Sequence, residues 1–144
     1  MFFFFYKGIL DDIFEFLESK VKVMNDVDRD CGLVLDEMST DEAREFCQTT
    51  KQLVGDTTLP ATENLASKAL VFMLVGIGSR WKQVVGYEHT GSSIESPLLK
   101  EAVVALIKKA ESIGLKVHFC TSDSGSESTI LERFWSKVLE DQCN

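Results

Sequence analysis

The sequence has few residues that break regular structure and no stretch long enough to cross a membrane. Only two prolines and nine glycines occur among 144 residues, which argues against a linker-rich or collagen-like chain. No apolar run approaches the ~18 residues of a membrane helix. The first ten residues, MFFFFYKGIL, lack the charged segment and cleavage site of a signal peptide. We therefore expect one folded domain outside the membrane.

Basic residues are also scarce. Fifteen Lys and Arg stand against 23 Asp and Glu, which gives a formal charge of −8. A free-standing DNA-binding module usually carries a basic surface. Any nucleic acid bound by this chain would need metal ions, a local basic patch or a separate basic domain.

Paired metal-binding cysteines are absent. The four cysteines, Cys31, Cys47, Cys120 and Cys143, form no CxxC pair, and no histidine stands at zinc-finger spacing. A structural zinc site is therefore not expected. Scattered single cysteines are typical of a reducing, intracellular compartment. Cys120 falls inside an apolar run, which predicts a buried thiol.

Two segments have helical periodicity. Residues 9–24 place apolar side chains at helical spacing, namely Ile9, Ile13, Phe16, Leu17 and Val21. The clearest helix is predicted over 97–113, with Ser96 as N-cap, Pro97 in the first position and Gly114 as the stop. Its apolar face comprises Leu99, Val103, Leu106, Ile107 and Ala110. A last helix is expected after Ser128 or Thr129, with Ile130, Phe134, Val138 and Leu139 on one face.

Four apolar runs predict strands, over residues 32–38, 69–77, 80–90 and 116–123. Gly78-Ser79 is a hairpin signal between the second and third runs. The polar stretch 39–48 predicts a loop or a short helix, and 51–59 a short strand with a turn at Gly55-Asp56. Hairpin-joined strands followed by helix, strand and helix predict a mixed α/β sheet.

The predicted topology brings two aspartates to one edge of the sheet. The helical crossover should return 116–123 beside 32–38, parallel to it, so that Asp36 and Asp123 lie at the same edge. Ligands of open α/β sheets gather at the carboxyl ends of the strands. Two close carboxylates repel unless a cation lies between them, and Mg²⁺ or Mn²⁺ prefers oxygen ligands. Two such ions can carry out phosphoryl transfer, which normally needs a third carboxylate.

A structural interpretation of the same residues stays open. Asp123 lies in SDSGS, a sequence that forms a turn by itself. Glu37 should point to the opposite face from Asp36, which makes it a weaker ligand candidate. Glu127 either reaches the site or lies in the first turn of the last helix, and the second interpretation is favoured. His89 and His118 have no acid at ligand spacing, so structural roles are expected for both.

Three segments together resemble a known family. CGLVLDEMS at 31–39, ALVFMLVGIGSRWKQVVGYEHTG at 69–91 and GLKVHFCTSDSGSES at 114–128 resemble strands of P-element-type transposases and their THAP-domain relatives. The order and gaps resemble the N-terminal half of that family's RNase H-like domain. The combination of DEM, FM-x-x-G and WKQ-x-x-x-Y is more specific than any one of them. One departure follows Asp123, where SGSES replaces the family's usual Gly and Asn.

The resemblance implies an incomplete DDE-type site. The family cuts and joins DNA with three acids and a divalent metal, Mg²⁺ or Mn²⁺. Asp36 matches the first catalytic and metal-binding acid and Asp123 the second, and nothing in this chain matches the third. We expect an N-terminal helical segment at 1–30 and a partial RNase H-like domain at 31–144, incomplete at the C-terminus. DNA is the partner of the full-length family protein, and the nucleus its compartment.

Three functions remain open at this stage. The first is a fragment of a DDE-type transposase that is not catalytic alone. The second is a domesticated domain without catalysis that interacts with protein or nucleic acid, through self-association or a protein partner. The third and weaker is an intact nuclease that uses Glu127 as its third acid.

Overall fold

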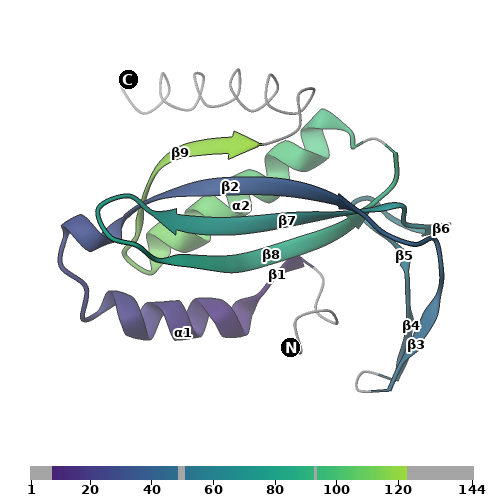
Figure 1. Cartoon of the computed structure of the whole chain (residues 1–144), viewed down its shortest axis with the longest axis horizontal. Helices are drawn as coiled ribbons and strands as arrows, with labels where there is room; N and C mark the ends of the chain where they lie inside the picture. The colour runs from purple at the N-terminus through teal and green to yellow at the C-terminus, as the bar shows by residue number, and fades with distance from the viewer. Residues whose placement is uncertain (1–7, 49–50, 93, 123–144) are drawn as a thin grey trace.

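A five-stranded sheet forms the centre of the molecule (Figure 1). The computed structural model describes residues 8–48, 51–92 and 94–122. The strand order is β1-β8-β7-β2-β9. The strands are β1 (Gly8–Ile9), β2 (Asp30–Ser39), β7 (Lys68–Gly76), β8 (Lys82–Thr90) and β9 (Lys116–Ser122). Strand β2 is antiparallel to β7 and parallel to β9, so the mixed α/β sheet predicted from the sequence is confirmed.

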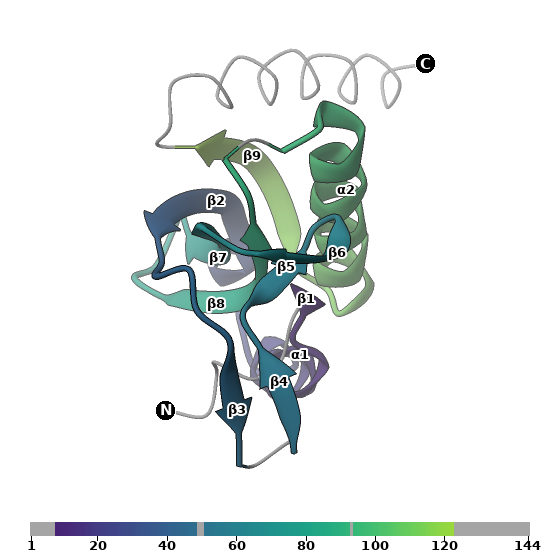
Figure 2. The same cartoon turned by 90° about the vertical axis from the view of Figure 1, so that its right-hand side faces the viewer.

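Two helices cover one face of this sheet. Figure 2 shows α1 (Asp11–Val21) and α2 (Ser96–Ser112) on the same side of β2 and β7. Alternate residues of the strands face them, as the two-residue period of a strand requires. The shared core comprises Phe14, Leu17, Val21, Cys31, Leu33, Leu35, Leu70, Phe72, Leu74, Val85, Leu99, Val103, Leu106, Ala110 and Leu115. Burial of this apolar surface orients β2, and with it Asp36.

The predicted N-terminal helix is shorter than expected. It runs from Asp11 to Val21, and Ile9 lies in β1 instead. Its buried side chains are Phe14, Leu17 and Val21, so the assignment of Phe16 to the apolar face is wrong. Phe16 is half-exposed, and the Lys20 amino group lies over its ring at 4.6 Å. Spacings of three and four residues place Phe14, and not Phe16, in line with Leu17 and Val21.

The crossover helix α2 agrees with its predicted face, while its start differs by one residue. It begins at Ser96, so the N-cap is Glu95 and not Ser96. Gly114 ends it with a φ of +102°, a conformation that glycine adopts without strain. The amide of Leu115 donates to the Ala110 carbonyl and that of Gly114 to the Glu111 carbonyl, the pattern of a Schellman cap. This cap turns the chain directly into β9.

The segment between β2 and β7 contains four short strands. Strands β3 (Glu45–Cys47) and β4 (Gln52–Val54) form one two-stranded sheet, and β5 (Asp56–Thr58) and β6 (Ala61–Leu65) form another. The short helix considered for 39–48 is therefore wrong, and the single strand over 51–59 is two strands divided at Gly55. Figure 1 shows the β3–β4 hairpin extending away from the main sheet.

A 3-10 turn, η2 (Val27–Arg29), leads from α1 toward β2. No helix in the described part of the chain is long and apolar enough to cross a membrane. Asp123, Glu127, Trp135, Cys143 and the predicted last helix lie outside the described residues.

Candidate functional site

Asp36 lies on β2, directly after the part of this strand that is buried in the core. Leu33 and Leu35 are fully buried on the helix-covered face, while Asp36 is exposed. Because successive side chains of a strand point to opposite faces, Asp36 points away from α1 and α2. No described residue forms an ion pair or hydrogen bond with its carboxylate. Its carboxylate oxygens are accessible as metal ligands, on a strand that pairs with a neighbour on both sides.

The parallel pairing of β2 with β9 is the expected feature that matters most for the site. Leu33 pairs with Cys120 and Leu35 with Ser122. Asp36 therefore follows the last β2 residue whose partner on β9 is described. Asp123, the second predicted ligand, lies outside the described residues, so the separation of the two carboxylates stays a prediction.

Glu37 has a different environment from Asp36, as the alternation of the strand predicts. Its carboxylate forms an ion pair of 2.6 Å with the Lys68 amino group, and its side chain is only 15% exposed. Strand β2 pairs Ser39 with Lys68 across the sheet. The carboxylate of Glu37 is thus neutralised by Lys68, the first residue of the neighbouring strand β7.

The two histidines have unlike surroundings. The His118 Nε2 atom lies 2.7 Å from Asp30 Oδ1, an acid that does not stand at ligand spacing in the sequence. The parallel register that brings Asp30 beside Lys116 places this contact, and separation along the sequence gives no sign of it. His89 lies edge-on to Tyr87, with ring centroids 5.5 Å apart. Burial lowers the pKa of His89 below its usual value, so its imidazole is uncharged at neutral pH.

The Cys31 thiol is buried and the Cys120 thiol is half-buried, and neither shows a sign of activation. Burial raises the pKa of Cys31 and of Cys120 to about 12, with the nearby Asp30 and Glu111 charges adding to the effect at Cys31. Since the thiolate is the nucleophile, both side chains are unreactive at neutral pH. Cys120 packs against the core, as its apolar role predicts, but it is half-buried and not fully buried as expected.

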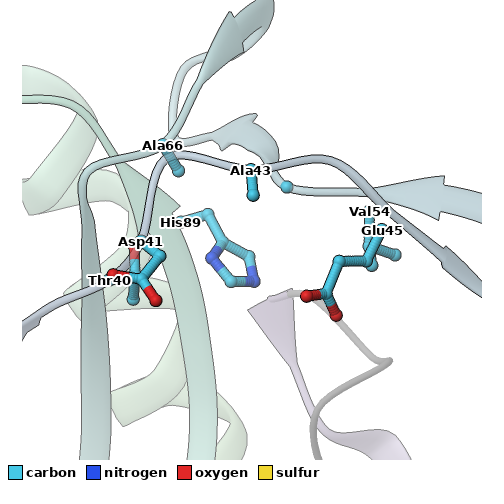
Figure 3. Close-up of a pocket in the computed structure, with 8 residues that line it drawn as sticks. Thr40, Asp41, Ala43, Glu45, Val54, Ala66 and His89 are labelled. Atoms are coloured by element: carbon cyan, nitrogen blue, oxygen red, sulfur yellow. The ribbon is translucent and has the colours of Figure 1, made fainter.

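A cavity of about 420 Å³ opens at the same end of the sheet as Asp36. Figure 3 shows the His89 ring between Asp41 on one side and Glu45 on the other. The cavity walls are fixed by backbone contacts. The Thr40 amide donates to the Ser67 carbonyl, and the Ala66 amide to the Gly55 carbonyl.

Sequence reasoning missed this cavity, because its residues come from a predicted loop, a short hairpin and the end of β8. Its Asp41 and Glu45 carboxylates and its neutral His89 imidazole can accept hydrogen bonds, so the cavity suits a ligand that carries hydrogen-bond donors. Across residues 8–48, 51–92 and 94–122, no three His, Cys, Asp or Glu side chains are arranged to hold a metal ion. Asp36 is therefore the one predicted metal ligand that the described residues contain.

Comparisons with known proteins agree on the type of domain. A family model described as "TNP-like, RNase H N-terminal domain" matches residues 5–133. The solved Drosophila P element transposase strand transfer complex is similar in fold, with a TM-score of 0.64 and 20% identity. The similarity covers 92% of this chain and 26% of that one, so this chain spans about a quarter of the transposase chain. No curated protein matches the sequence.

Proposed function

Because the chain belongs to the TNP-like, RNase H N-terminal domain family, we propose that it acts as part of the catalytic domain of a P element-type transposase. The family match over 5–133 and the shared fold support this assignment. The activity proposed for the complete protein is metal-dependent cleavage and joining of DNA. DNA as partner, the relationship to THAP-domain proteins and a nuclear location belong to the same proposal.

In this proposal Asp36 and Asp123 are the first two acids of a DDE-type site. The carboxylate of Asp36 is exposed and has no partner among the described residues, which fits a hard cation that takes oxygen ligands. In the complete protein, Asp36 and Asp123 would hold Mg²⁺ or Mn²⁺, which would supply charge stabilisation for phosphoryl transfer. Glu37 is excluded from this role because Lys68 already occupies its carboxylate.

The observation that carries the proposal is the parallel pairing of Leu35 with Ser122. An aspartate follows each member of this pair in the sequence: Asp36 follows Leu35, and Asp123 follows Ser122. Ligands of open α/β sheets bind toward the carboxyl ends of neighbouring parallel strands, so two acids that follow a register pair support a shared ligand site. With two of three acids, the chain by itself binds metal weakly and does not catalyse.

Paramagnetic NMR tests the metal site directly. Mn²⁺ added in the micromolar to millimolar range should broaden the amide signals of Leu35, Asp36 and Val71 before those of α1. Val71 is included because it pairs with Asp36 across β2 and β7. Asp36→Asn should abolish this broadening, since an amide is a poorer ligand than a carboxylate. Asp12→Asn removes an equal charge from an exposed position on α1 and should leave it unchanged.

Unchanged broadening in Asp36→Asn would contradict the metal site. It would favour the alternative, a transposase-derived interaction domain without catalysis. Loss of broadening in both variants would show that Mn²⁺ follows the net charge of the chain and no particular carboxylate.

A further inference from the structure

Two basic side chains flank a tryptophan at the end of the sheet opposite to Asp36. The turn from β7 to β8 forms a hollow of about 550 Å³, lined by residues 75–82. Arg80 and Lys82 are exposed, and Trp81 between them is half-buried. None of the described residues that line the hollow is acidic. Figure 1 shows this turn at the left end of the sheet, where β2 begins. Asp36 is the seventh of the ten residues of β2.

The tryptophan is held in a fixed position. Its Nε1 donates a hydrogen bond of 2.9 Å to the Asp28 carbonyl, which ties the turn to η2. The Gly76 amide donates to the Trp81 carbonyl at 2.8 Å. A Cβ at Gly76 would lie 2.6 Å from the Trp81 ring, so the ring rests directly on the backbone of the turn. The Trp81 ring and the backbone of the turn are thus in place before a ligand binds, and the exposed Arg80 and Lys82 side chains are what binding must order.

Charge decides which ligand fits. Neither Arg80 nor Lys82 takes part in an ion pair within the described residues. Of the acids near this end, the carboxylate of Asp30 pairs with His118, and Asp28 contacts Trp81 through its backbone carbonyl and not through its carboxylate. A chain of net charge −8 repels polyanions over most of its surface. Arg80 and Lys82 stand on either side of Trp81, and among the described residues no acid lines their hollow, so phosphate is attracted to this place.

We infer that the hollow of Arg80, Trp81 and Lys82 binds the phosphate backbone of a nucleic acid, at a site separate from the Asp36 carboxylate. Arg80 and Lys82 each contact a phosphate, and Trp81 offers an aromatic edge to the sugar or base. The choice of nucleic acid as the polyanion rests on the proposed function. The six residue-to-residue steps along β2 from Asp30 to Asp36 separate the two sites by on the order of 20 Å. About six base pairs of duplex cover that distance.

Fluorescence anisotropy with a labelled DNA duplex and the full chain tests the inference. Binding is measured in metal-free buffer over a range of NaCl concentrations. The double variant Arg80→Ala/Lys82→Ala should bind at least about fivefold more weakly at low salt. It should also lower the slope of log K against log salt by about 1.8, which corresponds to two lost phosphate contacts.

A matched control separates a local site from the net charge. Lys22→Ala/Lys108→Ala removes the same charge from exposed positions at the end of α1 and on α2. It should keep the wild-type slope. An equal loss in both double variants, an unchanged slope in Arg80→Ala/Lys82→Ala, or no binding by the wild type would each overturn the inference. Thermal unfolding of each variant shows whether it is folded.

The outcome is independent of the metal site. Asp36→Asn should keep the full salt slope in metal-free buffer while it loses the Mn²⁺ broadening. If instead Arg80→Ala/Lys82→Ala loses DNA affinity and the Mn²⁺ effect is absent from the wild type, the phosphate contact stands and the proposed metal function fails.

Discussion

Gly32 shows how closely β9 packs against β2. A Cβ at this position would lie 2.1 Å from the Phe119 ring, which covers the glycine on the face away from the helices. The two residues are register partners across the parallel pair. An aromatic side chain over a strand glycine fills the space that the missing side chain leaves.

Gly32→Ala should therefore destabilise the domain by about 1 kcal/mol. Displacing a packed ring costs roughly 1–3 kcal/mol, and the lower end applies because Phe119 is 37% exposed and has room to turn. Urea unfolding measures the change. Gly91→Ala is the matched control, since a Cβ there meets nothing within 4 Å. In a Phe119→Ala background, Gly32→Ala should cost little. An equal effect at Gly32 and Gly91 would refute the packing.

Single residues differ in how far the sequence reveals them. Asp36 could be predicted because it directly follows a continuous apolar run, a pattern visible within seven residues. The need for a glycine at position 32 comes from Phe119, which is 87 positions away in the sequence. Only the register of the folded sheet brings the two residues together. The His118–Asp30 contact was missed for the same reason. Asp123 was predicted by the same pattern as Asp36, and its position stays a prediction.

Among the elements, the β3–β4 hairpin is linked to the second small sheet through the side chain of one arginine, Arg44. The hairpin has only three residue pairs, and such a short ribbon is marginal in water. The Arg44 guanidinium connects it to the second small sheet, with Nε 2.7 Å from Asp56 Oδ1 and Nη2 donating to the Glu63 carbonyl. On the face away from the cavity, Phe46 and Leu53 pair across the strands and are 51% and 69% exposed.

Arg44→Ala should loosen this hairpin and leave the main sheet unchanged. An exposed ion pair contributes about 0.2–1 kcal/mol, so amide exchange at Phe46 and Leu53 should accelerate up to about fivefold. Amides of β2 and β7 should keep their protection. Arg80→Ala, which removes an exposed arginine outside any described ion pair, should not change exchange in the hairpin. Hydrogen exchange followed by NMR would contradict the role of Arg44 if the hairpin amides were unaffected.

Long elements were predictable and short ones were not. Apolar runs in the sequence predict the strands β2, β7, β8 and β9. Helical periodicity and a glycine after the last turn predict α2. Strands of three residues carry no period to detect. Their formation depends on contacts such as the Arg44 clamp and on Gly55, whose φ is +131° and where a Cβ would lie 2.1 Å from the Ala43 carbonyl oxygen. The cavity beside His89 is built from these elements and was missed with them.

For the whole molecule, the charge of −8 acts against the compact state. NaCl added to a low-salt buffer should therefore raise the unfolding temperature of the chain, because it screens this repulsion. The same screening applies to every variant with nearly the same charge. Salt alone thus supplies the baseline against which a bound metal must be measured.

MgCl₂ at matched ionic strength should raise the unfolding temperature further than NaCl. A cation that binds only the native state adds RT ln(1 + [L]/Kd), about 1.4 kcal/mol at ten times Kd. Asp36→Asn should lose this extra increment and keep the NaCl effect, since it removes the ligand and only one of the negative charges. Asp12→Asn should keep both. Scanning calorimetry decides between the two origins of stabilisation. If MgCl₂ and NaCl give one curve in the wild type, the ions screen the chain as a whole, and Asp36 holds no metal in the folded state.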